Sequence, residues 1–291
     1  MPSSPIIDTH LHLWDPRRIA YSWQKGNPLL GRPYLIEDYR KDSRGLDVDA
    51  MVFVECHADD GPAGGQYIKE IEFVEEEAGR DSRIRAIVAK APLERGQNVI
   101  GILEEMVARF PRLRAIRRIP EFEPDPEGFM LSSSFLDGVR LLKRFGLHFE
   151  LNVNYMQMDA ALEFVGRVPD VPIVLDHCGK PGIKGGHTDT FRRQIRAFAA
   201  HSNVVCKLSD LPVEANWSSW TEEQLRPFID ATIDAFGTER VMYGGDWPVC
   251  LQATSLQRWV DVVDRALAGL SESESRMIYR DNANRIYRLG L

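Results

Sequence analysis

The feature that most constrains the fold of this chain is an alternation, repeated eight times, between a short apolar segment and a longer segment with helical spacing. Short apolar runs are typical of strands buried on both faces of a parallel sheet. We expect strands from residue 6 and at 49–55, 84–89, 114–119, 147–153, 171–177, 204–208 and 241–245. We expect helices at 66–79, 99–110, 132–145, 159–168, 190–201, 222–236, 256–267 and 272–287. With no low-complexity linker to divide it, this rhythm predicts an α/β fold, a single and somewhat distorted (β/α)8 TIM barrel over residues 1–291.

Charge and hydropathy exclude several classes of protein. The net charge of −7 and the pI near 5.6 argue against a nucleic-acid partner, because phosphate binding needs a basic surface. No apolar run is long enough to span a bilayer, and residues 1–5 lack the basic flank and apolar stretch of a secretion signal. We therefore expect a soluble cytoplasmic protein. No heptad pattern indicates an oligomer, so the oligomeric state is not predicted.

The cysteines do not indicate a metal knuckle or a disulfide framework. Cys56, Cys178, Cys206 and Cys250 are widely spaced and form no Cys-x-x-Cys pair. Four thiols at such positions in a cytoplasmic protein are expected to stay reduced.

A His-x-His pair follows the first apolar run. Because side chains alternate along a strand, His10 and His12 lie on the same side, roughly 7 Å apart along the strand, where both imidazoles can face one ion or substrate. Asp8 shares their parity. Such a pair alone is a weak signal. Its place in the first strand, together with the distant segment 242–248, makes it a candidate site.

Polar residues end most of the other predicted strands as well. In (β/α)8 barrels the active site lies at the carboxyl ends of the strands, so these residues are the candidates for chemistry. They are His10, His12, Glu55, His57, Arg117, Glu150, Asn152, His177, Lys207 and Asp246. Closure of the barrel brings strands one and eight side by side. Asp246 should therefore lie beside the His pair.

Several of these positions also have a simpler interpretation. Glu55 and Lys207 could form a salt bridge at the barrel mouth, and His57 could face solvent. Of the neighbours Asp176 and His177, strand alternation lets only one point inward, and we expect this to be His177. The irregular segment 16–39 is either a functional cover or packing on the rim.

Three motifs together resemble the amidohydrolase superfamily. They are His10-Leu11-His12, the segment 175–181 around His177, and Gly244-Gly245-Asp246-Trp247-Pro248. The resemblance runs from Ile7 to Tyr287 and is closest to the branch of sugar lactonases and dicarboxylate lactonases. It implies a hydrolase that opens the ring of a small-molecule lactone.

The resemblance has departures that bear on metal binding. Metal-dependent members carry a bridging Lys or Glu after strand four and a His after strand five, where this chain has Arg117 and either Glu150 or Asn152. A binuclear centre is therefore not expected. The resemblance leaves two alternatives, a single Zn²⁺ on His10, His12 and Asp246 with Glu150 as a further candidate ligand, or catalysis without a metal.

Ring opening of a lactone needs an activated water, a stabilised oxyanion and a proton for the leaving alkoxide. We expect Asp246 to be the base. We expect the carbonyl to be polarised by Zn²⁺ or, without metal, by His177 and the His pair. Arg117 would grip a ring hydroxyl or the carboxylate formed. The residues expected to bind substrate are Trp14, Glu55, Asn152, Lys207 and Trp247. A sugar lactone is favoured over a pyrone because the mouth of the barrel offers many hydrogen-bonding groups. Segments 16–39 and 211–220 would select the particular lactone, and the sequence does not predict which one.

Other functions stay open at the level of sequence. A metal-dependent decarboxylase of aromatic or unsaturated acids would use a similar His and Asp set, and it would be favoured by a pocket dominated by Trp14, Trp23 and Trp247. A hydrolase of an amide or another ester is a second alternative. A catalytically silent sugar-binding barrel is a third, but a pure binding protein has no need of a carboxylate base beside two imidazoles.

Overall fold

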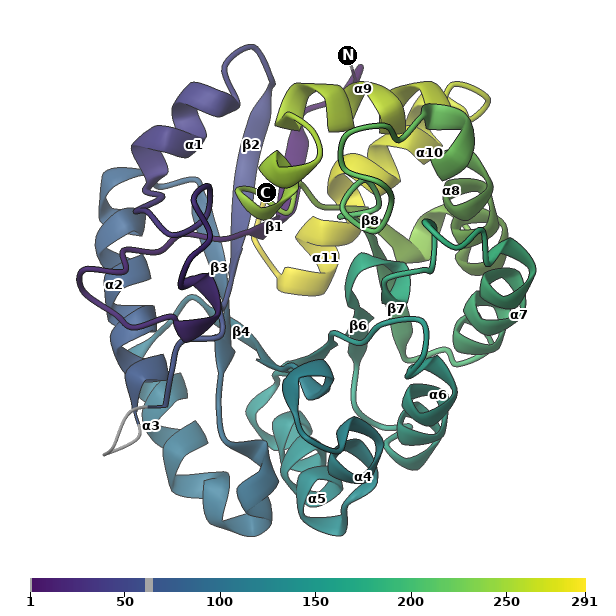
Figure 1. The fold of residues 1–291 in the computed structure, drawn as a ribbon. Helices are drawn as coiled ribbons and strands as arrows, with labels where there is room; N and C mark the ends of the chain where they lie inside the picture. The colour runs from purple at the N-terminus through teal and green to yellow at the C-terminus, as the bar shows by residue number, and fades with distance from the viewer. Residues whose placement is uncertain (1, 61–64) are drawn as a thin grey trace.

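Eight parallel strands form one sheet in the order of the sequence, surrounded by helices (Figure 1). The structure is a computed structural model that describes residues 2–60 and 65–291. The strands are β1 Ile6–Leu11, β2 Val48–Val54, β3 Ile84–Lys90, β4 Leu113–Arg118, β5 His148–Leu151, β6 Ile173–Leu175, β7 Val204–Leu208 and β8 Val241–Tyr243. The predicted (β/α)8 barrel is confirmed, and each strand falls within about three residues of its expected bounds.

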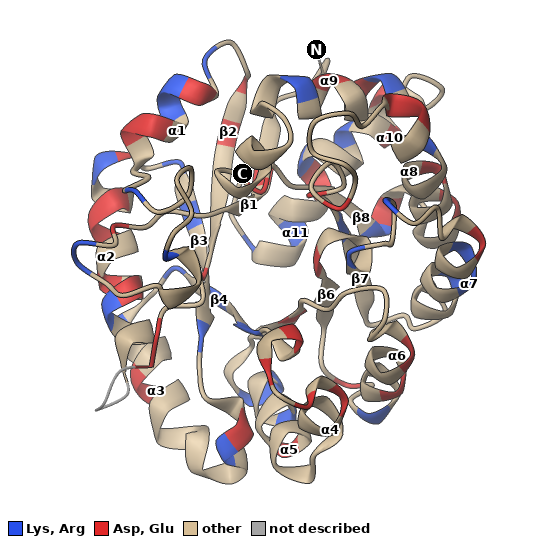
Figure 2. Ribbon diagram, viewed as in Figure 1, with Lys and Arg blue, Asp and Glu red and all other residues tan. Residues whose placement is uncertain are grey.

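The helices cover the outside of the sheet. They are α1 Ile36–Asp42, α2 Gln66–Arg80, α3 Ile100–Arg109, α4 Pro126–Leu131, α5 Ser133–Leu141, α6 Met158–Arg167, α7 Thr188–Ala199, α8 Glu222–Phe236, α9 Leu256–Ala266, α10 Glu272–Arg276 and α11 Asn282–Tyr287. The helix expected at 272–287 is divided, because five π-helical residues, Met277–Asp281, separate α10 from α11. Acidic and basic residues are interspersed on the outer helices (Figure 2). Within the described residues, no helix is both long and apolar enough to cross a membrane.

The seam between β1 and β8 is closed by few bonds rather than by a ladder. Leu11 and Trp247 form a single parallel bridge just beyond β8. The Asp8 carboxylate accepts a hydrogen bond of 2.7 Å from the Gly245 amide. A Cβ at Gly245 would lie 2.5 Å from Oδ2 of Asp8, so only glycine allows this approach. The expected neighbourhood of the first and last strands is confirmed.

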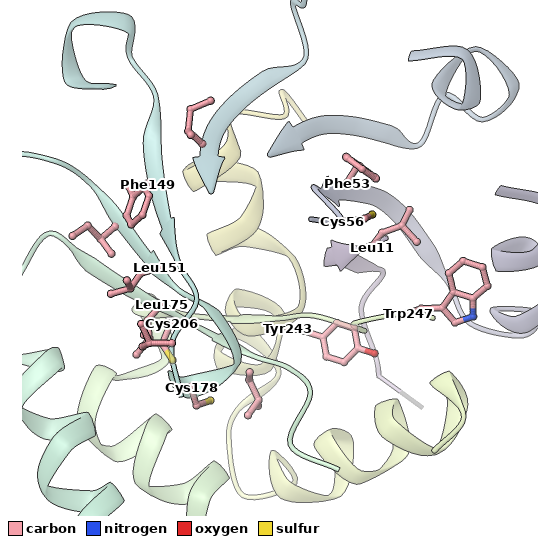
Figure 3. Close-up of a cluster of buried hydrophobic side chains, with 14 of the residues drawn as sticks. Leu11, Phe53, Cys56, Phe149, Leu151, Leu175, Cys178, Cys206, Tyr243 and Trp247 are labelled. Carbon is pink, nitrogen blue, oxygen red and sulfur yellow. The ribbon is translucent and has the colours of Figure 1, made fainter. Parts of the chain in front are cut away.

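Two apolar layers fill the structure on either side of the sheet. Large side chains such as Phe53, Phe149 and Leu175 belong to the larger cluster, part of which is shown in Figure 3. The smaller cluster is made mainly of Ala and Val side chains from the strands, together with Tyr287 of α11. Helix α11 therefore closes the amino-terminal end of the barrel, and the carboxyl ends of the strands are left for a site. All four cysteines are buried and free, as expected.

Candidate active site

A cavity of about 130 Å³ opens at the carboxyl ends of the strands. Six of the residues that the sequence assigned to the site line it: His12, Trp14, Arg117, Asn152, His177 and Asp246. Five others do not line it: His10, Glu55, Glu150, Lys207 and Trp247. The cavity is also lined by residues that the sequence analysis did not assign to the site, or expected elsewhere: Trp23, Cys56, His57, Ile119, Phe122, Lys180, Asp210 and Val249.

Asp246 lies against the His pair, although more than two hundred residues separate them in sequence. Its Oδ1 is 3.2 Å from Nε2 of His12 and 3.6 Å from Nε2 of His10. The side chain is 2% exposed, and burial raises the pKa of Asp246 to about 7. Such a carboxyl exchanges its proton near neutral pH, as a general base must.

The two imidazoles beside Asp246 are neutral. Burial and the Arg117 charge lower the pKa of His12 to about 3, and burial together with the Lys207 charge lowers the pKa of His10 well below its usual value. Nδ1 of His12 lies 2.8 Å from the Val54 carbonyl oxygen, which can only accept a hydrogen bond. Nδ1 therefore carries the proton, and Nε2 presents its lone pair toward Asp246.

The turn after β6 places two neighbouring side chains in the site. His177 has a φ of 54°, in the left-handed region, which interrupts the alternation of the strand. As a result Asp176 faces Lys207 inside the barrel, while His177 lines the cavity with its Nδ1 2.9 Å from Oγ of Ser209. The expectation that only one of the pair points inward is wrong, because it assumed that the strand continued through both residues.

Beneath the cavity lies an ionic layer, which we define as Glu55, Arg117, Glu150, Asp176 and Lys207. Arg117 pairs with Glu55 at 2.8 Å and with Asp176 at 3.3 Å. Lys207 pairs with Glu150 at 2.5 Å and with Asp176 at 3.1 Å. Glu55 and Lys207, for which a mutual salt bridge was one of two alternatives, therefore pair with other residues instead. All five side chains are at most 3% exposed. Burial alone would lower the pKa of Arg117, but the charges of Glu55 and Asp176 have the larger, opposite effect and hold this pKa above its ordinary value.

Trp247 lies behind the cavity wall. It is fully buried, donates from Nε1 to Oδ2 of Asp42 at 3.0 Å, and contacts Tyr34 and Tyr39 edge to face. These contacts fix the segment that carries Asp246. The environment of Trp247 is that of a packing residue, and direct contact with a substrate would require it to leave this environment.

Segment 16–39 contributes one wall of the cavity. Trp14 and Trp23 meet edge to face with ring centroids 5.5 Å apart, and Trp23 donates from Nε1 to the Cys56 carbonyl oxygen at 2.8 Å. Phe122, which follows β4, also lines the cavity, with its ring centroid 4.8 Å from that of His57. Of the two interpretations of the segment, its contact with the cavity through Trp23 supports a cover more than packing on the rim alone.

Asp210 is the main site residue that the sequence analysis missed. It follows β7 by two positions, where the rule that polar residues end barrel strands applies to it as well as to Lys207. Its carboxyl hydrogen-bonds to that of Asp246, and burial together with the Asp246 charge raises the pKa of Asp210 well above its usual value. His57, which the sequence left either at the strand end facing the site or facing solvent, lines the cavity, where its φ of 54° turns the chain inward.

The comparisons with known proteins agree with this geometry. The family model described as amidohydrolase matches residues 7–289. The chain belongs to the amidohydrolase family. This amidohydrolase is 32% identical over 296 residues to the L-fucono-1,5-lactonase of Burkholderia multivorans, covering 97% of this chain and 96% of that enzyme. It is 22% identical to the L-rhamnono-gamma-lactonase of Scheffersomyces stipitis, covering 99% and 100%. A crystal structure of an amidohydrolase from B. multivorans with bound Zn superposes with a TM-score of 0.87 at 30% identity, covering 98% of this chain and 99% of that one.

The donor set of this amidohydrolase fits one divalent ion of the zinc type. His10, His177 and Asp246 offer two imidazole nitrogens and a carboxylate oxygen within 4.8 Å of one another, a ligand chemistry that suits Zn²⁺. Glu150 belongs to a different group, with His10 and Asp176. Because Lys207 already pairs with Glu150, we do not expect that carboxylate to join Asp246 on one ion.

Proposed function

We propose that this amidohydrolase opens the ring of a sugar lactone to the hydroxy acid, with Asp246 as the base that activates water. The observation that carries the proposal is the position of Asp246: buried at the cavity, beside two neutral imidazoles, with a pKa near 7 and no Arg or Lys paired to it among the described ion pairs. The similarity to two enzymes named as lactonases supports the choice of a cyclic ester. We place this activity in one domain spanning 1–291, and a cytoplasmic location stays a prediction.

In the proposed reaction, Asp246 takes a proton from a water molecule in the cavity as the water oxygen bonds to the lactone carbonyl carbon. The bond between that carbon and the ring oxygen then breaks. Asp246 returns its proton to the departing ring oxygen, so the carboxyl serves as base and then as acid. The product is a hydroxy carboxylic acid, which ionises in solution.

Charge that develops on the carbonyl oxygen needs donors in a buried site. His177 is the proposed donor, since Ser209 holds its Nδ1 at 2.9 Å and leaves Nε2 for the cavity. Arg117 supplies permanent positive charge on the neighbouring wall, and Glu55 and Asp176 fix its guanidinium in place.

If an ion binds, His10, His177 and Asp246 would hold it, and it would supply polarisation of the carbonyl and a lower pKa for bound water. Nη1 of Arg117 lies 3.3 Å from Nε2 of His10. A divalent ion on that nitrogen would have to compete with the guanidinium. We therefore propose that the chain's own residues carry the reaction, and that an ion contributes little to its rate.

The charges around the cavity favour a neutral, hydroxylated lactone over a dicarboxylate. Two cations line it, Arg117 and Lys180, and each is already paired, Arg117 with Glu55 and Asp176, and Lys180 with Glu121 at 2.8 Å. Asp210 and Asp246 add acidic groups to the same wall. A substrate that carries carboxylates would find no uncommitted cation among the described lining residues, whereas hydroxyl groups would find polar partners.

The alternative functions have less support. A cavity dominated by Trp14, Trp23 and Trp247 would have favoured a decarboxylase, but Trp247 does not line the cavity. A silent binding barrel does not account for a carboxyl with a raised pKa beside neutral imidazoles.

The test is hydrolysis of a panel of aldono-1,4-lactones and aldono-1,5-lactones, followed with a pH indicator. Protein with measured metal content is assayed before and after chelation, and a pyrone dicarboxylate is included. Turnover of aldonolactones that survives chelation is the expected result. Turnover that is lost on chelation and restored by Zn²⁺ would place an essential ion in the site, and no turnover of any lactone would overturn the proposed function.

A further inference from the structure

Two buried oxygen acceptors flank His177 at the cavity. Asn152 follows β5 and Asp210 follows β7, so they lie on either side of the segment after β6 that carries His177. Each residue is 4% exposed. Oδ1 of Asn152 and Oδ1 of Asp210 meet no hydrogen-bond donor from residues 2–60 and 65–291, yet both residues line the cavity.

Such acceptors are unfavourable in a folded protein unless a donor reaches them. Buried polar oxygens lose their hydration on folding, and this loss is recovered only by a hydrogen bond. Asp210 also has a φ of 63°, an uncommon backbone conformation for a residue other than glycine. Strain together with an unpaired acceptor at one residue is typical of functional sites.

The aromatic side chains of the cavity cannot provide the same interaction. The rings of Trp14, Trp23 and Phe122 accept only weak hydrogen bonds, and the indole nitrogens of both tryptophans already donate to backbone carbonyl groups. His57, whose ring centroid lies 4.8 Å from that of Phe122, is the polar side chain next to these rings. The cavity therefore combines aromatic rings with the open acceptors of Asn152 and Asp210. A ring with hydroxyl groups on one face would match this combination.

We propose that Asn152 and Asp210 each accept a hydrogen bond from a hydroxyl group on the lactone ring, and so determine which sugar lactone is opened. This inference rests on the proposed function and adds to it the residues that select the substrate. Both acceptors prefer a hydroxyl donor to an ether oxygen or a carboxylate, which offers no proton. A substrate that lacks one of the two hydroxyl groups would leave a buried acceptor unpaired.

The experiment compares the best aldonolactone of the panel with its monodeoxy analogues, each lacking one ring hydroxyl group. For wild-type protein, we expect kcat/KM to fall about tenfold or more for two of the analogues. Asn152→Leu replaces the amide by an apolar side chain of similar size. In this variant, we expect the ratio of kcat/KM for the parent lactone to kcat/KM for one of these two analogues to fall toward one. The same ratio for the other analogue should stay as in the wild-type protein, so that the second analogue is the control within each variant.

Asp210 is tested by two variants that tolerate its positive φ. Asp210→Asn keeps an acceptor at the same place and should keep the discrimination, whereas Asp210→Gly removes it and should lose discrimination at the second hydroxyl group. Thermal unfolding verifies that each variant is folded. Should Asp210→Gly prove too slow to assay, the Asn152→Leu ratios decide the matter alone.

The outcomes separate the two proposals. If wild-type protein opens lactones but treats the parent and every monodeoxy analogue within threefold of one another, this inference is overturned and the proposed function stands. Full discrimination retained in folded Asn152→Leu would also overturn it. If no lactone is opened, the proposed function itself fails.

Discussion

The ionic layer and the cavity above it are built from the same residue types but differ in how their polar groups are paired. In the ionic layer, Arg117 and Lys207 lie between 2.5 and 3.3 Å from carboxylate oxygens. At the cavity, Asp246 lies beside neutral imidazoles and the Asp210 carboxyl group, and no Arg or Lys is paired with it among the described ion pairs. Oδ1 of Asn152 and Oδ1 of Asp210 have no donor among the described residues.

This difference separates support from chemistry. Groups that are paired inside the barrel have fixed positions and little left to offer a substrate. Groups at the cavity have hydrogen-bonding positions without a partner, which a substrate or water can occupy. Substitutions of the ionic-layer residues that do not line the cavity, Glu55, Glu150, Asp176 and Lys207, should therefore act mainly on stability. Substitutions at the cavity, which Arg117 also lines, should act mainly on rate.

The largest effect is expected for Asp246→Asn. The amide keeps the size of the side chain but cannot take a proton from water. We expect kcat to fall on the order of 10⁴-fold with thermal stability retained. Asp230→Asn, on the exposed face of α8, is the control and should change kcat little. Near-normal turnover by folded Asp246→Asn would remove Asp246 as the base.

Lys207→Met tests the ionic layer. The variant leaves Glu150 and Asp176 without their ammonium partner in a site with no solvent access. Breaking a buried ion pair in this way costs about 3–5 kcal/mol of unfolding free energy. Urea unfolding measures the loss. The control is Arg226→Met, whose exposed pair with Asp230 on α8 contributes less than about 1 kcal/mol. Equal effects of the two substitutions would contradict the division between support and chemistry.

His177→Gln tests the donor proposed for the carbonyl oxygen. We expect kcat to fall about 10²- to 10³-fold, the usual effect of removing one oxyanion donor. His201→Gln, two residues after the end of α7 and outside the cavity, should leave kcat unchanged. A change in KM alone for His177→Gln would assign the residue to binding rather than to stabilisation of the transition state.

The pH profile gives the smallest effect and reports on Asp246 in the wild-type protein. Because burial raises the pKa of Asp246 to about 7, the carboxyl holds its proton below that pH and cannot accept another. We expect kcat/KM to fall about tenfold for each pH unit below 7 and to level above it. Initial rates from pH 5.5 to 8.5, corrected for spontaneous hydrolysis, measure this. A flat profile down to pH 5.5 would mean that the base has an ordinary carboxyl pKa.

The sequence predicted the barrel well, because strands buried on both faces must be apolar and their ends are where polar residues can appear. It placed Asp246 beside the His pair because closure of the barrel brings the ends of the first and last strands together. It could not predict the partners of Glu55 and Lys207, which depend on distances across the barrel. Nor could it predict that the chain turns left-handed at His177 and His57, a conformation that tertiary contacts impose on residues that rarely adopt it.

The seam between β1 and β8 separates His12 from Asp246. His12 follows β1 and Asp246 follows β8, and within residues 2–60 and 65–291 these are the one pair of adjacent strands without a continuous ladder. Local openings occur first where few backbone hydrogen bonds resist them. Warming that frees β1 from β8 would part the carboxyl from its imidazole while the outer helices are still folded. We therefore expect this joint to set the heat tolerance of catalysis, with activity lost before the barrel as a whole unfolds.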